Sequence, residues 1–204
     1  MLNLNISVNT LTNISTPQPD NMEHGPYYSF YLRKQNVSGN VAPRLYCNII
    51  ASATRKIEIW DPYVHESDMA IFANLNYPVD ITILTLFSNQ QRTNRFTSLE
   101  RSLKQNVPTE FLTNTSFRLA FVDKSRHRSD ATGEWQFHDR FLIIDDEEYY
   151  IIGSSITYHL TAKQSTGIMR VEHDGDKSII RDAFNETYNM AVRDNCVICL
   201  QNLL

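Results

Sequence analysis

The chain has 204 residues, and 19 lysines and arginines against 23 aspartates and glutamates give it a net charge of −4 at pH 7. Its length fits one compact domain, and a content of 42% hydrophobic and 21% charged residues excludes wholesale disorder. The acidic balance argues against a protein that coats nucleic acid through bulk charge, and no apolar run is long enough for a membrane-spanning helix.

Residues 1–42 are expected to form a β-rich extension. Apolar and polar residues alternate over 2–8, which predicts a half-buried strand, and a loop rich in asparagine, threonine and proline follows. The segment Tyr27–Gln35 predicts a second strand. No catalytic signal is found in this extension.

The start of the chain and the cysteines both favour a cytoplasmic protein. The first charged residue is Asp20, so the start lacks the basic segment of a secretory signal. Cys196 and Cys199 form a single CxxC, which is half of a zinc site, and Cys47 stands alone. We therefore interpret the cysteines of the terminal segment as small buried thiols.

From Pro43 onward the pattern alternates between strands and helices, which predicts a layered α/β domain over 43–204. Helices are expected from Pro43 to about Ala53, over Ser67–Asn74, over Thr93–Gln105 and over Lys177–Arg193, the last with Ile180, Phe184 and Ala191 inward. Strands are expected at Lys56–Trp60, Val79–Phe87, Phe117–Phe121, Trp135–Asp145, Tyr149–Gly153 and Gly167–Val171.

One of these strands and the turn after it carry the chemistry. His138 and Arg140 are two residues apart, so in a strand they project from the same face. A guanidinium beside an imidazole favours the neutral, nucleophilic ring, and its fork of donors matches two phosphate oxygens. Gly153 would let the backbone come close to a ligand, and Ser154 or Ser155 can add a donor. The segment therefore suits holding a phosphate and attacking it with a histidine.

Each piece also has an ordinary structural interpretation. A histidine in a strand is more often a hydrogen-bonded structural residue. Arg140 can simply pair with Asp139 or Asp145, and a serine after glycine is common in turns. The ordered combination on one strand–turn–strand unit favours the functional interpretation.

This combination resembles the signature of the phospholipase D superfamily, His-x-Lys-x4-Asp followed by a Gly-Ser turn. The match is a variant in which Arg140 replaces the lysine, with His138, Asp145 and the turn Gly153-Ser154-Ser155 in order. The segment HDRFLIID, residues 138–145, is similar to that of single-motif bacterial members, many of them nuclease-like or defence-associated. The resemblance covers about 43–193 and implies a phospholipase D-like α/β/α domain with a mixed central sheet.

The resemblance implies a role for each residue of the motif. His138 would be the nucleophile that forms a phosphohistidine, and Arg140 would grip the phosphate. Ser155 or Ser154 would donate to a phosphate oxygen, whereas Asp145, on the opposite parity of the strand, is expected to support the turn or backbone. No metal or cofactor is implied. Because the mechanism needs two motifs, a homodimer would supply the second histidine.

The sequence departs from the family pattern at three points. Ile156 stands where an asparagine is common, and arginine in place of lysine changes the geometry of the donors. The acidic residue that orients the histidine is unassigned, with Glu172 and Asp174 as candidates. These departures leave open a slowed enzyme or a phosphate-binding descendant without turnover.

A short basic run outside the motif has two interpretations. Lys124, Arg126 and Arg128 lie in the loop before the motif strand and are either solvated charges or contacts to a nucleic-acid backbone.

Polar residues on two other elements are read as structural. Arg92, Arg95 and Arg101 are interpreted as the exposed face of a helix. Asp61 and His65 follow a strand end that either opens toward the site or, as the preferred interpretation, is capped by these residues.

The sequence as a whole predicts a metal-independent phosphodiesterase, a homodimeric nuclease that works in the cytoplasm, with a role in bacterial anti-phage defence as one setting. Two alternatives stay open. One is a phospholipase or a hydrolase of small phosphodiesters. The other is a phosphate-binding or assembly module that works with other subunits of a multiprotein system.

Overall fold

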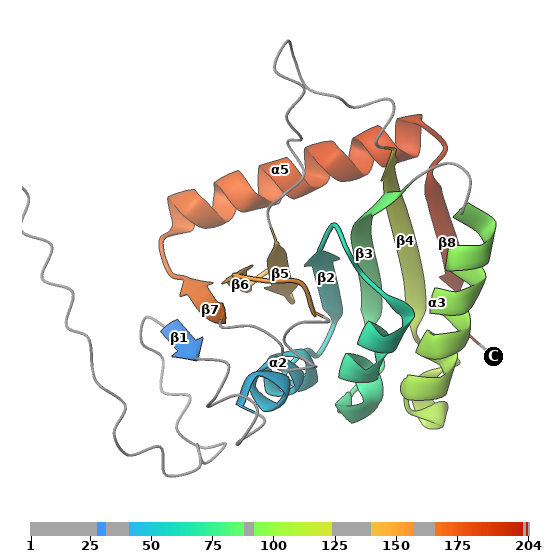
Figure 1. Cartoon of the computed structure of the whole chain (residues 1–204), viewed down its shortest axis with the longest axis horizontal. Coiled ribbons are helices and arrows are strands. Elements are labelled where there is room, and N and C mark those ends of the chain that lie inside the picture. Colours follow the sequence, from blue (N-terminus) through green and yellow to red (C-terminus); the bar gives the residue numbers. More distant parts are fainter. Residues whose placement is uncertain are drawn as a thin grey trace, which may run out of the picture.

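The computed structural model describes residues 28–31, 41–87, 92–123, 140–156, 166–201 and 203. These residues form one eight-stranded sheet of order β1-β7-β6-β5-β2-β3-β4-β8 with helices on its two faces (Figure 1). The strands are β1 (Tyr28–Tyr31), β2 (Lys56–Trp60), β3 (Asp80–Phe87), β4 (Ser116–Asp123), β5 (Phe141–Ile144), β6 (Glu148–Ile152), β7 (Thr166–Val171) and β8 (Val197–Gln201). The helices are α2 (Val41–Ala51), η2 (Glu66–Asn74), α3 (Arg92–Asn106), η4 (Thr109–Phe111) and α5 (Asp174–Arg193), of which η2 and η4 are 3-10 helices.

The sheet is mixed, as the resemblance implied. β2, β3 and β4 run parallel, whereas β5 pairs antiparallel with β2 and β8 pairs antiparallel with β4. β5, β6 and β7 form an antiparallel meander, and β1 pairs antiparallel with β7. β1 lies within the expected strand Tyr27–Gln35 and is an outermost strand of the same sheet, while the rest of that segment and the expected strand over 2–8 lie outside the described residues.

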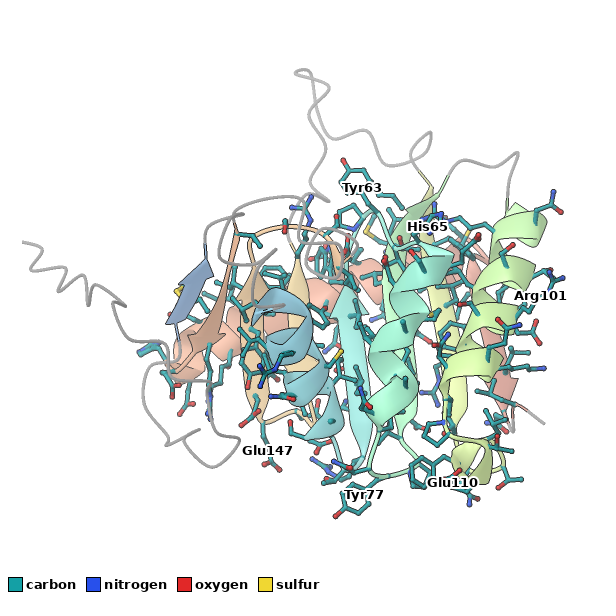
Figure 2. The ribbon with its side chains drawn as sticks, turned by 60° about the horizontal axis from the view of Figure 1, so that its bottom comes forward. Tyr63, His65, Tyr77, Arg101, Glu110 and Glu147 are labelled. Atoms are coloured by element: carbon teal, nitrogen blue, oxygen red, sulfur yellow. The ribbon has the colours of Figure 1, made fainter. Side chains whose placement is uncertain are left out.

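Both faces of the sheet centre are covered, which explains why β3 is predominantly apolar and β-branched. The long helix α5 lies on one face, and α2, η2 and α3 lie on the other (Figure 2). The rings of Trp60 in β2 and Phe184 in α5 are 6.2 Å apart, which fixes the face of β2 that α5 covers. Ile180, Phe184 and Ala191 are buried, so the expected inner stripe of α5 is confirmed.

Several boundaries differ from the sequence expectations. α2 begins at Val41, so Pro43 lies inside the first turn, where a missing N–H costs no hydrogen bond. β8 was not expected, although Asp194 and Asn195 form a turn directly before it, with a φ of 54° at Asn195. Cys196, directly before β8, is buried, whereas Cys199, within β8, is exposed. The interpretation of Cys199 as a buried thiol was therefore wrong.

The topology brings the two ends of the motif to different edges of the sheet. We call the edge where β2, β3 and β4 end the motif edge, since β5 begins there and β6 ends there. The opposite edge holds the start of β2 and the β5–β6 turn. Figure 2 shows Tyr63 and His65 at the motif edge and Glu147 at the opposite edge.

Within the described ranges, none of the helices combines the length and apolarity that a membrane crossing requires.

Candidate functional site

The described part of the motif is centred on Arg140 and Ser155 at the motif edge. Arg140 directly precedes β5, and Ser155 follows β6, so the antiparallel pairing of these strands brings the two residues together. The backbone N–H of Ile152 donates to the carbonyl oxygen of Arg140 at 2.9 Å and extends the ladder to the turn. The Arg140 Nε donates to the Ser155 Oγ at 3.2 Å. Two residues that the sequence nominated as phosphate ligands are thus in contact.

Asp61 connects this pair to the end of β2. It is 2% exposed, and its two carboxylate oxygens accept the backbone N–H groups of Tyr63 and Ile156, each at 2.9 Å. Its Oδ1 lies 3.9 Å from the Arg140 Nε. The interpretation of Asp61 as a capping residue is right for the turn at Tyr63. It missed the contacts to Ile156 and Arg140, which are 95 and 79 residues away in the chain.

The site has the donors that an anionic ligand needs. The Arg140 guanidinium supplies a fixed positive charge, and its central carbon lies 5.6 Å from the centroid of the Tyr63 ring. The Ser155 hydroxyl accepts from Arg140 and keeps its own proton to donate. The Ser154 Oγ is buried and has no hydrogen-bond partner among the described residues. A cation with a serine hydroxyl in contact with it is a chemically sound phosphate site.

Gly153 serves the fold in a way that the sequence did not indicate. We expected it to let the backbone come close to a ligand. A Cβ atom at this position would instead lie 2.8 Å from the Thr166 Oγ1 and 3.2 Å from the Gly167 nitrogen. The Gly153 N–H also donates to the Gly167 carbonyl at 2.9 Å. The space of the missing side chain is therefore used by β7, because two strands approach each other closely at this point.

Ile156 has a structural explanation of its own. Its side chain is 1% exposed and belongs to the hydrophobic core, while its backbone N–H is held by Asp61. The position at which the family commonly has asparagine is thus an apolar packing position in this chain.

Asp145 lies at the opposite edge, away from Arg140. Its carboxylate accepts from the Thr54 N–H and hydroxyl at 2.8 and 2.7 Å, and from the N–H groups of Arg55 and Lys56 at 2.8 Å each. Burial alone would raise the pKa of this carboxyl. The hydrogen bonds from Lys56, Thr54 and Arg55 lower the pKa by more than burial raises it, so the net pKa is below the usual value. These contacts tie the β5–β6 turn to the start of β2. Asp145 thus supports the turn and the neighbouring backbone, as its position in the strand predicted.

The β5–β6 turn itself requires backbone of the left-handed region. Asp145 and Asp146 have φ of 55° and 66°, a conformation that aspartate tolerates better than most residues. Two such residues between antiparallel strands produce the tight turn that sets the register of the hairpin.

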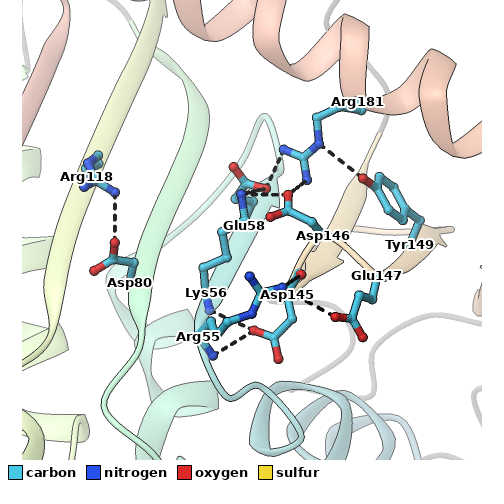
Figure 3. A network of polar contacts seen from close by, with 10 residues as sticks. All are labelled: Arg55, Lys56, Glu58, Asp80, Arg118, Asp145, Asp146, Glu147, Tyr149 and Arg181. Atoms are coloured by element: carbon cyan, nitrogen blue, oxygen red, sulfur yellow. Dashed lines mark hydrogen bonds and ion pairs between the residues drawn. The ribbon is translucent and has the colours of Figure 1, made fainter.

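An ion-pair network lies near this turn, on the face that α5 covers (Figure 3). Arg181 of α5 contacts Glu58 and Asp146 at 2.6 Å each and donates to the Tyr149 hydroxyl at 3.2 Å. Lys56 contacts Asp146 at 2.7 Å. Burial lowers the pKa of Arg181, but Tyr149 and Glu58 raise it by more, and the net pKa is above the usual value. This network attaches α5 to the sheet.

The strand topology also places the two acidic residues that were candidates for orienting the histidine. Glu172 and Asp174 come after β7, which begins at the motif edge and runs away from it, so both lie at the opposite edge. Glu172 contacts Arg170 at 3.3 Å, and Asp174 contacts Lys177 at 3.5 Å. Neither residue therefore lies at the edge that holds Arg140 and Ser155, and His138, which either was nominated to orient, lies outside the described residues.

Arg95 was interpreted as an exposed helix residue, and this was wrong as well. Its guanidinium donates to the carbonyl oxygens of Leu86, at 3.2 Å, and of Val64. Burial lowers its pKa, against the opposing charges of Asp61 and Asp68. Arg95 thus ties α3 to the motif edge, whereas Arg101 is exposed as expected.

The remaining nominated residues cannot be placed. His138, Lys124, Arg126 and Arg128 lie outside the described residues. In the described ranges, no group of three or more histidine, cysteine, aspartate or glutamate side chains is arranged to hold a metal ion.

The chain was compared with known proteins. No family model matches the sequence, and no curated protein matches it. Among solved structures, NucT from Helicobacter pylori is 12% identical, with 80% of this chain and 96% of NucT covered and a TM-score of 0.50. The chain shares its fold with NucT. The predicted α/β fold with a mixed central sheet is thereby confirmed.

Two further solved structures are similar at lower scores. Nuc from Salmonella typhimurium, a phospholipase D family member, is 14% identical, with 87% of this chain and 99% of Nuc covered and a TM-score of 0.48. The archaeal chromatin protein TrmBL2 is 13% identical with a TM-score of 0.44. The alignment covers 83% of this chain and 54% of TrmBL2, so the chain spans about half the length of that protein.

Proposed function

We propose that this chain is a metal-independent phosphodiesterase of the phospholipase D type that hydrolyses nucleic acid. The observation that carries the proposal is the contact of the Arg140 Nε with the Ser155 Oγ at 3.2 Å. Residues fifteen positions apart that the motif assigns to one phosphate meet at the same edge of the sheet. The shared fold with NucT is consistent with this proposal.

In the proposed reaction His138 is the nucleophile. One ring nitrogen attacks the phosphorus, the bond to the leaving oxygen breaks, and a phosphohistidine forms. A second histidine gives its proton to the leaving oxygen and then accepts a proton from the water that hydrolyses the phosphohistidine. Arg140 and Ser155 stabilise the charge on the non-bridging oxygens throughout.

The second histidine is proposed to come from a second copy of the chain. The sequence contains the motif once, so an isologous dimer would place two His138 side chains across its two-fold axis. Mixing wild-type subunits with excess His138→Ala subunits should then inhibit activity strongly. Full activity of a monomer would contradict the dimer.

A nucleic-acid substrate is proposed from the cationic loop before the motif. Lys124, Arg126 and Arg128 would contact the phosphate backbone in a chain whose net charge of −4 otherwise repels a polyanion. Replacing these three residues should weaken binding similarly across sequences and flatten its salt dependence, while hydrolysis of a nitrophenyl phosphodiester changes little.

The central experiment measures cleavage of single-stranded DNA, duplex DNA, RNA and phospholipid vesicles, each in excess EDTA. We expect cleavage of nucleic acid, none by His138→Ala, and a phosphohistidine trapped by acid quenching of the wild type. Loss of activity on chelation with rescue by Mg²⁺ would refute the mechanism. Cleavage of vesicles alone would replace the nuclease proposal by the lipid alternative.

Two finer parts of the proposal concern the cell. We propose a cytoplasmic location and a role in anti-phage defence, alone or with other subunits of a defence system. Phage plating on cells that carry the wild type or His138→Ala tests the second part. Equal plating on both strains would remove it.

A further inference from the structure

An exposed aromatic ring lies next to the proposed phosphate site. Tyr63 follows β2 at the motif edge, and 46% of its surface is exposed, one of the largest exposures among the described large hydrophobic side chains. The Arg140 guanidinium lies over this ring, with its central carbon 5.6 Å from the ring centroid. Figure 2 shows Tyr63 projecting from the body of the protein at this edge. A cation and an exposed aromatic ring are thus side by side.

The backbone that carries this ring is held in place from both sides. The Tyr63 N–H donates to Asp61, and the preceding Pro62 carbonyl accepts the N–H of Leu86 in β3 at 3.3 Å. Asp61 is itself fixed by its hydrogen bonds and by its N–H, which donates to Leu84 at 3.0 Å. An aromatic residue on such a segment loses little conformational freedom when a ligand binds.

A buried tyrosine would be explained by packing, but this one keeps almost half of its surface in water. Exposed aromatic rings next to phosphate ligands are the platforms on which unpaired bases stack, because every base offers a π-face. A nucleotide has its phosphate and its base close together, as the guanidinium and the ring are here. The cap at this turn involves the Asp61 carboxylate and the Tyr63 N–H, so it does not account for the Tyr63 ring.

We infer that Tyr63 is a base-stacking residue, so that the site takes single-stranded nucleic acid with an unpaired base next to the bound phosphate. This inference rests on the proposed function and adds the substrate class. A duplex keeps its bases in the helical stack and cannot offer one to Tyr63 unless it opens. The stacking is tolerant of base identity, so the preference is for unpaired strands and not for a sequence.

The test compares Tyr63→Ala and Tyr63→Phe with the wild type. Three substrates of equal length are cleaved: single-stranded DNA, duplex DNA, and a strand of abasic tetrahydrofuran units. We expect Tyr63→Ala to lower kcat/KM for single-stranded DNA about tenfold and to leave the abasic strand unchanged. Tyr63→Phe should stay close to the wild type on all three, because it keeps the ring.

Tyr77→Ala is the matched control. Tyr77 is 52% exposed and lies at the opposite edge of the sheet (Figure 2), so its loss should change none of the three rates. If Tyr63 only steadies Arg140, Tyr63→Ala will slow all three substrates equally, and the inference is overturned. Unchanged cleavage of single-stranded DNA by Tyr63→Ala overturns it as well.

A failure of the proposed function has a different signature. A wild type that cleaves none of the nucleic acids but hydrolyses phosphatidylcholine vesicles removes the nuclease proposal, and the base-stacking inference with it. If the wild type cleaves nucleic acid and Tyr63→Ala cleaves single-stranded DNA at the same rate, only the base-stacking inference is removed.

Discussion

The two edges of the sheet use polar side chains in different ways. At the opposite edge the Asp145 carboxylate accepts four hydrogen bonds of 2.7–2.8 Å, and Arg181 contacts two carboxylates at 2.6 Å. At the motif edge the Arg140 Nε lies 3.2 Å from the Ser155 Oγ and 3.9 Å from Asp61. The Ser154 hydroxyl there is buried without a partner among the described residues.

This difference favours the proposed function, in which the opposite edge is structural and the motif edge binds the substrate. Short, mutually satisfied contacts hold the backbone of one edge together and leave no capacity for a ligand. A buried hydroxyl without a hydrogen-bond partner, such as that of Ser154 among the described residues, is costly in a folded protein. The comparison predicts that substitutions at the opposite edge change stability, and that substitutions at the motif edge change activity.

The largest effect is expected from Arg140. Arg140→Ala removes the charge that stabilises the phosphate oxygens and should lower kcat/KM by about 10²–10³. Arg140→Lys should retain more activity, because a cation remains. Arg101→Ala, which removes an exposed arginine of α3, is the control and should have no effect. If Arg140→Ala and Arg101→Ala are equally active, the motif edge is not the site.

Arg181 should give the largest loss of stability. Arg181→Ala removes one of the two cations that contact Glu58 and Asp146, whose side chains are 11% and 43% exposed, while Lys56 keeps its contacts with both. We expect the free energy of unfolding in urea to fall by roughly 2–3 kcal/mol. Arg118→Ala is the control: its contact with Asp80 is 3.6 Å and both side chains are about a third exposed or more, so it should lose less than about 1 kcal/mol. Equal losses would remove the distinction between buried and exposed pairs.

Asp145 tests the same edge through pH. Asp145→Asn places an amide among three N–H donors and should cost about 2 kcal/mol at pH 7. The folded pKa is below the unfolded one, so the wild-type advantage is complete above pH about 3.9 and is lost as pH falls through the folded pKa. Glu147→Gln, at a side chain 77% exposed, is the control and should leave the stability curve unchanged. A gap that stays constant down to pH 2 would contradict this account.

Asp61 should give the smallest of the four effects, and on activity more than stability. Asp61→Asn keeps one oxygen for an N–H group but removes the charge beside Arg140, so kcat/KM should fall about tenfold. Asp68→Asn is the matched control, because Asp68 is equally buried and accepts the N–H of His65 at 2.8 Å. Similar losses of stability with a loss of activity only in Asp61→Asn would support a positioning role. Equal activities would show that Asp61 is only a cap.

The sequence alone determined most of the regular structure. β2 was predicted at its observed bounds, and β3, β7 and α5 lie within a few residues of their predicted bounds, because apolar periodicity and proline act over short distances. Ile180, Phe184 and Ala191 were predicted on the inner face of α5 for the same reason. The order of strands and helices also indicated an α/β sheet before any strand was paired.

The tertiary structure decided which polar residues meet. Arg140 contacts Ser155 because β5 and β6 are antiparallel neighbours, and it lies near Asp61 because β2 ends where β5 begins. The same directions send Glu172 and Asp174 to the other edge and give the space beside Gly153 to β7. Local sequence carries the period of an element, whereas strand order and direction are fixed by the packing of the whole chain. Arg140 and Ser155 could therefore be nominated from the sequence, whereas the proximity of Asp61 and Tyr63 to Arg140 follows only from the sheet.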